Sequence, residues 1–348
     1  MSERIEYIDI AKCIAILGIV CVHLPNGSII NICETFHVVT FFIISGILNA
    51  KKNIGESFIV YAKKRSKVLL WPYLMLSICN LAISVILALK NQEINILLND
   101  FFKTILLRGI GTLWFFPILL GGELICRLIY EYLAKRYKVF LLWILINIVT
   151  ILFIQYNNHI HCSSFLNFNE VFMWPIELLT TIVIASSFIL LGYLIAPILY
   201  GLIDYSKRNS IVCIILFIVF AVLDIIVYPK YNCDLHYLRF DSYIVYLFCS
   251  ICGSISIILL SILLSYSRIP IKYLTFLGSN SIIIMCTHKD FFIVYILSLI
   301  CTKIGLYNIV NSIVTLLLTV IVEICLIKII NDTRLKNLFR IPIEIKTT

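Results

Sequence analysis

The sequence predicts an all-α, polytopic membrane protein of about ten transmembrane helices, with both termini in the cytoplasm. Hydrophobic residues make up 61% of the 348 residues and charged residues 14%, whereas soluble domains are about 45–50% apolar and about 25% charged. Long stretches also carry no Asp, Glu, Lys or Arg. Each is near or above the roughly 18–20 residues that a helix needs to cross the hydrocarbon core. We therefore expect a multi-pass protein of the cell (cytoplasmic) membrane.

These apolar stretches, extended by their apolar neighbours, define the ten predicted spans. The spans cover roughly residues 8–24, 34–50, 68–89, 110–130, 139–156, 176–199, 210–228, 243–266, 274–300 and 305–328. The polar segments between them are short. A single integral membrane domain is therefore expected over residues 1–348.

The lysines and arginines predict how the chain is oriented. With ten spans, 21 of the 28 Lys and Arg residues fall on the side of the N-terminus and six on the opposite side, while Lys289 lies inside a span. Because cytoplasmic loops carry the excess of these residues, both termini are expected in the cytoplasm. The net charge of +9 is thus mostly a topology signal. Membrane lipids are its expected partners, and no nucleic-acid partner is expected.

Ionisable residues inside spans are costly to bury, so each is a candidate site residue. Three of them are histidines: His23, His37 and His288. If the first span starts near Ile8, His23 lies about 22 Å further along a helix that rises 1.5 Å per residue. His288 falls at a similar depth and His37 enters from the outer side. The three imidazoles could therefore share one outward-facing cavity.

The remaining polar residues have simpler interpretations. Asp224, Glu177 and Glu323 lie near predicted span ends and are expected at the membrane interface. His236 falls in an outer loop, where we expect it to be solvated. A buried histidine can be structural or a general base, and three could hold a metal ion. Because the local HxxxH-type spacing of zinc sites is missing, no metal is expected.

A basic cluster, residues 63–67 with the sequence KKRSK, directly precedes the third predicted span. One interpretation is a positive-inside signal that only orients the chain. The other is that several cations at the cytoplasmic mouth of the bundle bind phosphates, such as those of a nucleotide-containing acyl donor.

Six short motifs follow one another along most of the chain. They are Asp9, Lys12 and His23 in the first span, FHV and FFIISG within 36–46, KRSK before PY within 64–73, LWFFP at 113–117, LGY at 191–193, and LGSNS followed by His288 within 277–288. In this order they resemble the acyltransferase-3 family of membrane-bound O-acyltransferases. The resemblance is strongest to its sugar O-acetylase branch, which includes fucose 4-O-acetylase-like and exopolysaccharide-modifying members.

The sequence departs from the family pattern at a few positions. Cys13 stands where a small glycine is usual, and Lys64 and Lys67 stand where arginines are commoner. The lysines keep the positive charge but lose bidentate recognition of phosphate.

The resemblance implies transfer of an acyl group, usually acetyl from acetyl-CoA as co-substrate, onto a hydroxyl of a cell-surface or lipid-linked glycan at the outer face. His23 is then the expected general base on the acceptor hydroxyl, or a transient acyl carrier. His37 and His288 are expected to orient the acceptor or stabilise developing charge. Asp9 and Lys12 are expected to organise access of the donor.

The resemblance also implies binding residues and partners. The expected donor-binding residues are Lys12, Lys64, Arg65, Lys67 and Trp114. The expected acceptor-binding residues are Ser45, Asn280 and Ser281. Partners are a glycan or lipid-linked sugar acceptor, membrane lipids, and a second copy of the chain or the machinery of polysaccharide synthesis.

Two other classes of function compete with the enzyme. A secondary transporter or lipid-linked glycan flippase would also have about ten spans, with internal repeats and paired broken helices. The halves show no convincing repeat, although Pro72, Pro117, Pro175 and Pro197 could interrupt helices. The third class is a non-catalytic membrane sensor, which would neither hydrolyse acetyl-CoA nor transfer its acyl group.

Overall fold

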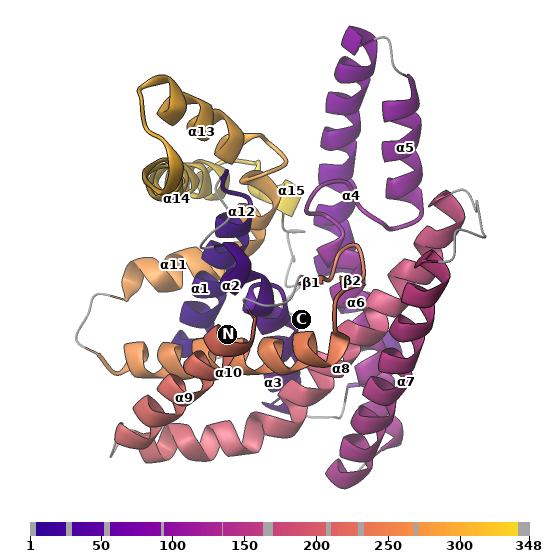
Figure 1. Cartoon of the computed structure of the whole chain (residues 1–348), viewed down its shortest axis with the longest axis vertical. Coiled ribbons are helices and arrows are strands. Elements are labelled where there is room, and N and C mark those ends of the chain that lie inside the picture. Colours follow the sequence, from indigo (N-terminus) through magenta and orange to yellow (C-terminus); the bar gives the residue numbers. More distant parts are fainter. Residues whose placement is uncertain are drawn as a thin grey trace, which may run out of the picture.

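The computed structural model describes residues 5–25, 30–51, 56–91, 94–133, 135–162, 170–206, 210–228, 233–267 and 271–339. Within these ranges the chain is predominantly helical, as predicted (Figure 1). The helices are α1 (Glu6–Val22), α2 (Ile30–Phe36), α3 (Val39–Lys51), α4 (Phe58–Asn91), α5 (Ile94–Ile105), α6 (Phe115–Tyr132), α7 (Arg136–Cys162), α8 (Glu170–Ser206), α9 (Ile211–Val227), α10 (Tyr243–Ser265), α11 (Lys272–Ser279), α12 (Ser281–Thr287), α13 (Ile293–Lys303), α14 (Asn308–Asp332) and α15 (Lys336–Phe339). One antiparallel hairpin, β1 (Cys233–Asp234) and β2 (Arg239–Phe240), joins α9 to α10.

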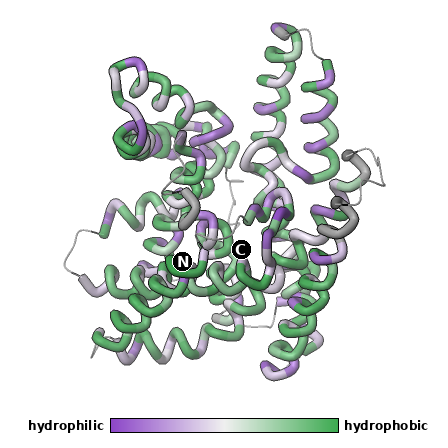
Figure 2. The backbone as a smooth tube through the Cα atoms, viewed as in Figure 1, coloured by the Kyte–Doolittle hydropathy of each residue, from purple (hydrophilic) through white to green (hydrophobic). Residues whose placement is uncertain are grey.

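Six helical stretches in the described part of the chain are long and apolar enough to cross a membrane. They are Cys33–Ala50, Phe58–Lys90, Arg136–Tyr156, Met173–Ser206, Tyr243–Ser265 and Asn308–Asp332. Figure 2 shows hydrophobic residues along most of their length. The helices α1 and α9 have 17 residues each, and α6 contains three charged side chains within 18 residues. The count of ten spans and the cytoplasmic termini therefore stay predictions.

The ninth predicted span, residues 274–300, was wrong as a single helix. The structure divides it into α11, α12 and α13. The first break is at Asn280, whose side-chain amide donates to the carbonyl of Phe276. The second break precedes α13, where Phe292 adopts a left-handed conformation with φ 58°. Both breaks lie at short polar runs, residues 278–281 and 288–290, whereas the prediction rested on the apolar average of the whole stretch.

Two helices are much longer than the membrane is thick. At 34 residues α4 extends about 51 Å and at 37 residues α8 extends about 55 Å, against a hydrocarbon core of about 30 Å. Pro72 lies inside α4, and Pro175 and Pro197 lie inside α8, without ending either helix. The basic residues 63–67 are on the first turns of α4, just before its apolar part.

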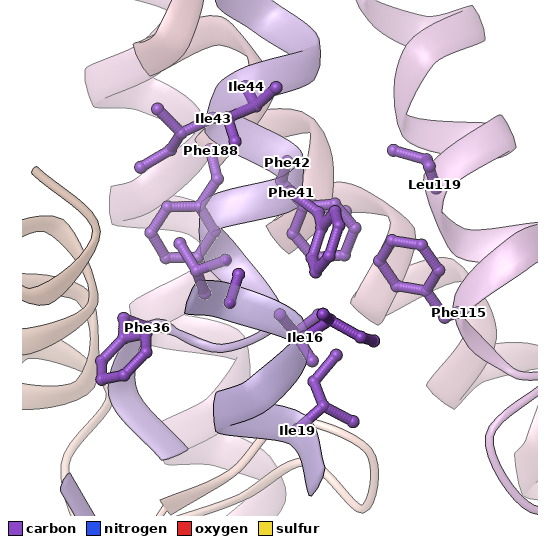
Figure 3. Close-up of a cluster of buried hydrophobic side chains, with 14 of the residues drawn as sticks. Ile16, Ile19, Phe36, Phe41, Phe42, Ile43, Ile44, Phe115, Leu119 and Phe188 are labelled. Atoms are coloured by element: carbon purple, nitrogen blue, oxygen red, sulfur yellow. The ribbon is translucent and has the colours of Figure 1, made fainter. Parts of the chain in front are cut away.

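The core is a layer of large apolar side chains where α1, α3, α6 and α8 meet (Figure 3). The ring of Phe115 stacks on Phe42 with centroids 5.6 Å apart and meets Phe41 edge-on. The helices α3 and α8 cross so closely that a Cβ atom at Gly46 would overlap the carbonyl of Ile189. A Cβ at Gly192 would likewise overlap that of Ile43. The glycines of the FFIISG and LGY motifs are thus explained by packing.

Candidate functional site

The imidazole rings of His23 and His288 lie against each other, with centroids 5.3 Å apart and an angle of 27° between the rings. His23 directly follows the last residue of α1, and His288 directly follows the last residue of α12. The helical rise predicted a similar depth for these two histidines, and the structure shows in addition that their rings are in contact. Their catalytic role stays a prediction.

The buried histidine of the pair, His288, presents one nitrogen without a hydrogen-bond partner. Its Nδ1 lies 2.7 Å from the carbonyl oxygen of Ile284. Because a carbonyl only accepts hydrogen bonds, Nδ1 carries the hydrogen and Nε2 of the neutral ring is an acceptor. This Nε2 is buried and has no partner among the described residues. A proton acceptor therefore lies directly behind His23.

The third histidine, His37, lies at the break between α2 and α3. Its Nδ1 is 2.7 Å from the carbonyl oxygen of Cys33, and its Cβ lies beside Gly18 of α1. His37, His236, His288 and Lys289 all act electrostatically on His23. The histidines from four separate parts of the chain are therefore gathered at one end of the bundle.

A cavity of about 540 Å³ adjoins this histidine cluster. Its lining residues are His23, Pro25, Asn80, Ile83, Ser84, Leu87, Asp100, Ile110, Gly111, Lys289, Asp290, Phe292, Val294, Tyr295 and Ser298. Of the three histidines predicted to share an outward-facing cavity, His23 lines this one. His288 lies behind His23 and does not line the cavity.

The loop before α6 forms the floor of the cavity and is fixed by Asp290. The backbone N–H of Thr112 donates to Oδ1 of Asp290 at 3.2 Å, and the Thr112 hydroxyl lies 3.0 Å from Oδ2. The same hydroxyl lies 2.7 Å from the carbonyl oxygen of Met285 on α12. These contacts join α6 to the helix that carries His288.

Trp114 lies with the histidines, not with the basic residues of α4 that were predicted to bind the donor with it. Its indole stacks on His236 of the β1–β2 hairpin at 4.8 Å between centroids. Tyr237 stacks on the same imidazole at 4.5 Å. The prediction that His236 is solvated was therefore wrong, since two aromatic rings enclose it. Burial, and next the charge of Arg108, lower the pKa of His236 to about 3.

The hairpin is held in place by Arg108. Its Nη1 donates to the carbonyl oxygen of His236 at 2.9 Å, and its Nη2 lies 2.9 Å from a carboxylate oxygen of Glu177 on α8. The guanidinium also lies over the ring of Tyr237. A fixed cap thus covers the histidine end of the bundle.

A second polar cluster lies nearer the other end of α4. Arg65 binds Glu123 of α6 through two hydrogen bonds, Nε to Oε2 at 2.5 Å and Nη2 to Oε1 at 2.7 Å. The hydroxyl of Ser45 on α3 also donates to Oε1 at 2.5 Å. Glu123 is only 2% exposed. The sequence marked Glu123 as a charge inside a span but gave no indication of its partners.

This cluster changes the environment expected for two predicted site residues. Ser45 was predicted to bind the acceptor, yet its hydroxyl is directed to Glu123. Arg65 was predicted to bind donor phosphates, yet its guanidinium is engaged by the same carboxylate. Lys64 and Lys67 are exposed on the same turns, with Lys64 only 3.9 Å from Glu56. Both lysines remain accessible to a ligand.

Asp9 and Lys12 lie on the first turns of α1, well away from the histidine cluster. Asp9 is 7% exposed, and Lys12 is half-buried. Fourteen residues separate Asp9 from His23, which corresponds to about 21 Å along a helix. The two predicted functions on α1, donor access and proton transfer, thus fall at opposite ends of one helix.

Two other predicted acceptor residues lie at the junction of α11 and α12. Asn280 donates to Phe276 and Ser279 and accepts a hydrogen bond from Asn331 of α14. Ser281 is the first residue of α12 and is 6% exposed. Neither lines the cavity described above. Their role in binding an acceptor stays a prediction.

Two acidic residues expected at the membrane interface are buried instead. Glu323 of α14 is 1% exposed and accepts hydrogen bonds from Thr287, the residue before His288. Asp224 of α9 is 3% exposed and accepts one from Thr35. Their positions near span ends suggested an interface because a sequence does not show how neighbouring helices cover them.

In the described part of the chain, no group of three or more His, Cys, Asp or Glu side chains is placed to hold a metal ion. Cys249 and Cys252 have CxxC spacing on α10, and both are buried free thiols.

Comparison with known proteins identifies a family across nearly the whole chain. The model of the acyltransferase-3 family, described as an acyltransferase domain, matches residues 5–328. The searches of curated proteins and of solved structures gave no match. The matched range contains the histidine cluster, the cavity and the pair formed by Arg65 and Glu123.

Proposed function

We propose, from the premise that this chain belongs to the acyltransferase-3 family and is a membrane acyltransferase, that it O-acylates a glycan. In this proposal an acyl group, acetyl in the simplest case, moves from cytoplasmic acyl-CoA to a hydroxyl of a cell-surface or lipid-linked glycan on the outer face. The observation that carries the proposal is the position of His23, which lines the cavity and stacks on the buried His288.

The cavity gives His23 access to an acceptor hydroxyl, and a neutral imidazole is a suitable general base near neutral pH. His23 takes the hydroxyl proton as the oxygen attacks the thioester carbonyl. The carbon–sulfur bond then breaks, and the coenzyme A thiolate receives the proton from His23. Acyl transfer is complete with no net change in the protein, and the acceptor carries the new ester.

His288 and His37 support this chemistry as fixed neutral rings. Each uses Nδ1 to donate to a backbone carbonyl, so the other nitrogen of each neutral ring is an acceptor. Neither ring lines the cavity, so His288 is proposed to support His23 through the ring stack, and the orientation of the acceptor by these two histidines stays a prediction. Stabilisation of negative charge would require a donor instead.

The donor is proposed to enter from the basic end of α4. Lys64 and Lys67 are exposed there and suit the phosphates of coenzyme A. Arg65 and Glu123 fix α4 against α6 beside them. Arg65 and Asn80, which lines the cavity, are 15 residues apart and thus about 22 Å along the helix. The long pantetheine arm would carry the thioester over this distance to His23.

The proposed setting is the cytoplasmic membrane, with both termini inside. The acceptor could then be presented on the outer side while acyl-CoA stays in the cytoplasm. A second copy of the chain or the machinery that builds the glycan is the proposed protein partner, and no nucleic acid is involved.

The test is mass spectrometry of surface glycans from cells that carry the gene, lack it, or carry His23→Ala. We expect acyl esters only with the unchanged chain, because the variant lacks the proposed base. Leu89→Ala is the control, since Leu89 is 76% exposed and does not line the cavity. Equal membrane levels of all variants are checked by immunoblot. Acyl esters at normal levels with His23→Ala would exclude His23 from the mechanism.

A further inference from the structure

We propose that the acceptor is an anionic glycolipid, a sugar joined through phosphate to a long aliphatic chain, and that it enters the cavity sideways from the bilayer between α4 and α13. This inference rests on the acyl transfer proposed above. It is carried by three features of the cavity: its apolar wall, the exposed side chains at its rim, and Lys289, a lysine in the lining that forms no ion pair with any described residue.

The apolar wall is larger than a free sugar requires. Its residues are Ile83, Leu87, Ile110, Phe292, Val294 and Tyr295. A sugar is recognised through hydrogen bonds to its hydroxyls, and an apolar surface of this extent leaves them without partners. An aliphatic chain gains free energy from the same wall, at roughly 25 cal/mol for each Å² of apolar surface removed from water.

The rim of the cavity carries exposed apolar side chains from two helices. Leu87 of α4 is 38% exposed, and Tyr295 of α13 is 63% exposed. Figure 1 shows α13 and the α4–α5 hairpin on opposite sides of the upper part of the molecule. In a membrane protein, exposed apolar side chains of this kind face lipid tails. A lipid can therefore pass between α4 and α13 without crossing water.

The polar end of the cavity carries one lysine, Lys289, together with the carboxylates of Asp100 and Asp290. Asp290 accepts hydrogen bonds from Thr112. Asp100 accepts one from Ser84 and lies 3.7 Å from the ammonium of Lys103. Lys289 is exposed in the cavity and forms no ion pair with any described residue. Its ammonium group is suited to a phosphate.

The arrangement of these groups gives the acceptor a direction. Lys289 is next to His288 in the chain and lines the same cavity as His23. A phosphate held by Lys289 therefore places the attached sugar beside His23, while the aliphatic chain lies along the wall toward the bilayer. A glycan without a lipid would use His23 but neither Lys289 nor the wall.

The first test measures binding with the full chain in lipid nanodiscs. The probe is glucose linked through one phosphate to a benzophenone-tagged farnesyl chain, and the neutral comparison is the same farnesyl chain linked directly to glucose. We expect photolabelling on α4 and α13, at least tenfold weaker labelling for Lys289→Gln, and no change for Lys303→Gln, an exposed lysine outside the cavity. Equal labelling by the neutral probe, or no effect of Lys289→Gln, would overturn the proposal.

The second test examines the sideways entrance. Leu87→Trp fills the rim, whereas Ile86→Trp adds the same volume at a 65% exposed neighbour that does not line the cavity. We expect only Leu87→Trp to abolish labelling. Equal labelling of both variants would contradict entry between α4 and α13. Inorganic phosphate at millimolar concentration should compete weakly, and full competition would show a phosphate site without a lipid requirement.

Failure of the inference and failure of the acyl transfer can be told apart. Release of the coenzyme A thiol from acetyl-CoA is followed in the same nanodiscs. Specific labelling without thiol release supports the lipid site and counts against acyl transfer. Acyl transfer to a water-soluble oligosaccharide that Lys289→Gln leaves unchanged supports the enzyme and overturns the lipid acceptor.

Discussion

The guanidinium of Arg65 holds both carboxylate oxygens of Glu123, at 2.5 and 2.7 Å, in a pair that joins α4 to α6. Glu123 is 2% exposed. Removing one member leaves the other charge buried without its partner, which costs about 3–5 kcal/mol. We therefore expect Glu123→Leu to lower the melting temperature strongly. The double change Arg65→Met with Glu123→Leu should recover much of the loss, because it removes both charges.

The matched control for that pair is Lys64→Met. Lys64 lies 3.9 Å from Glu56 with a side chain that is 63% exposed, and exposed pairs contribute about 0–1 kcal/mol. Thermal unfolding in detergent should therefore change little for Lys64→Met. A melting temperature of Glu123→Leu equal to that of Lys64→Met would show that the buried pair does not hold the two helices.

Thr287 positions the helix end that carries His288. Its hydroxyl lies 2.8 and 2.7 Å from the two carboxylate oxygens of Glu323. Thr287→Val leaves this buried carboxylate without that donor, at a cost of about 1–3 kcal/mol. We expect a lower melting temperature and a lower kcat with an unchanged KM for the donor. Thr180→Val is the control, because among the described residues the Thr180 hydroxyl donates only to the carbonyl of Ile176 within its own helix.

Gly278 of the LGSNS motif lets α11 approach α1. A Cβ atom at this position would overlap the carbonyl oxygen of Asp9, so Gly278→Ala should force the helices apart and cost about 1–3 kcal/mol. Gly201→Ala is the control, because no described residue has an atom within 4 Å of the added Cβ. That change should be neutral or stabilise α8 by about 0.5–1 kcal/mol. Equal melting temperatures of the two variants would contradict the close approach.

The stability of the hairpin should depend on pH through His236. Burial, then the charges of Arg108, Lys289 and Lys103, lower its pKa from 6.5 to about 3. Between these values the unfolded chain binds a proton that the folded chain does not. The contribution of His236 to the free energy of unfolding is therefore complete above pH 6.5 and is lost as pH falls toward 3. His236→Phe can keep the stack on Trp114 but cannot titrate.

We expect the melting temperature of His236→Phe to fall less between pH 7 and pH 4.5 than that of the unchanged chain. The difference between the two curves isolates His236 from the other titrating groups. Parallel curves would show that His236 is already protonated in the folded protein, and would contradict its enclosure between two rings.

The sequence could predict depth along a helix, because the rise per residue is fixed. That is why His23 and His288 were expected at the same level and do meet. It could also predict a predominantly helical membrane chain from composition. It could not predict the partners of Arg65, because a contact with Glu123 depends on how two helices are rotated and placed against each other.

The same limit explains the errors. The stack of His236 on Trp114 joins residues that are more than 100 positions apart, and no local pattern reports such a contact. The breaks on either side of α12 fall at two polar runs, residues 278–281 and 288–290, which the span prediction included in one continuous helix. Glu323 and Asp224 lie near span ends, yet neighbouring helices bury both.

The central claim is that His23 takes the proton from the acceptor during acyl transfer. The most direct measurement is chemical rescue of His23→Gly in nanodiscs, with thiol release from acetyl-CoA followed in the presence of the glycan acceptor. The substitution should abolish release, and added imidazole should restore part of it, because the cavity of about 540 Å³ admits the small base. Full activity of His23→Gly without imidazole would contradict the claim.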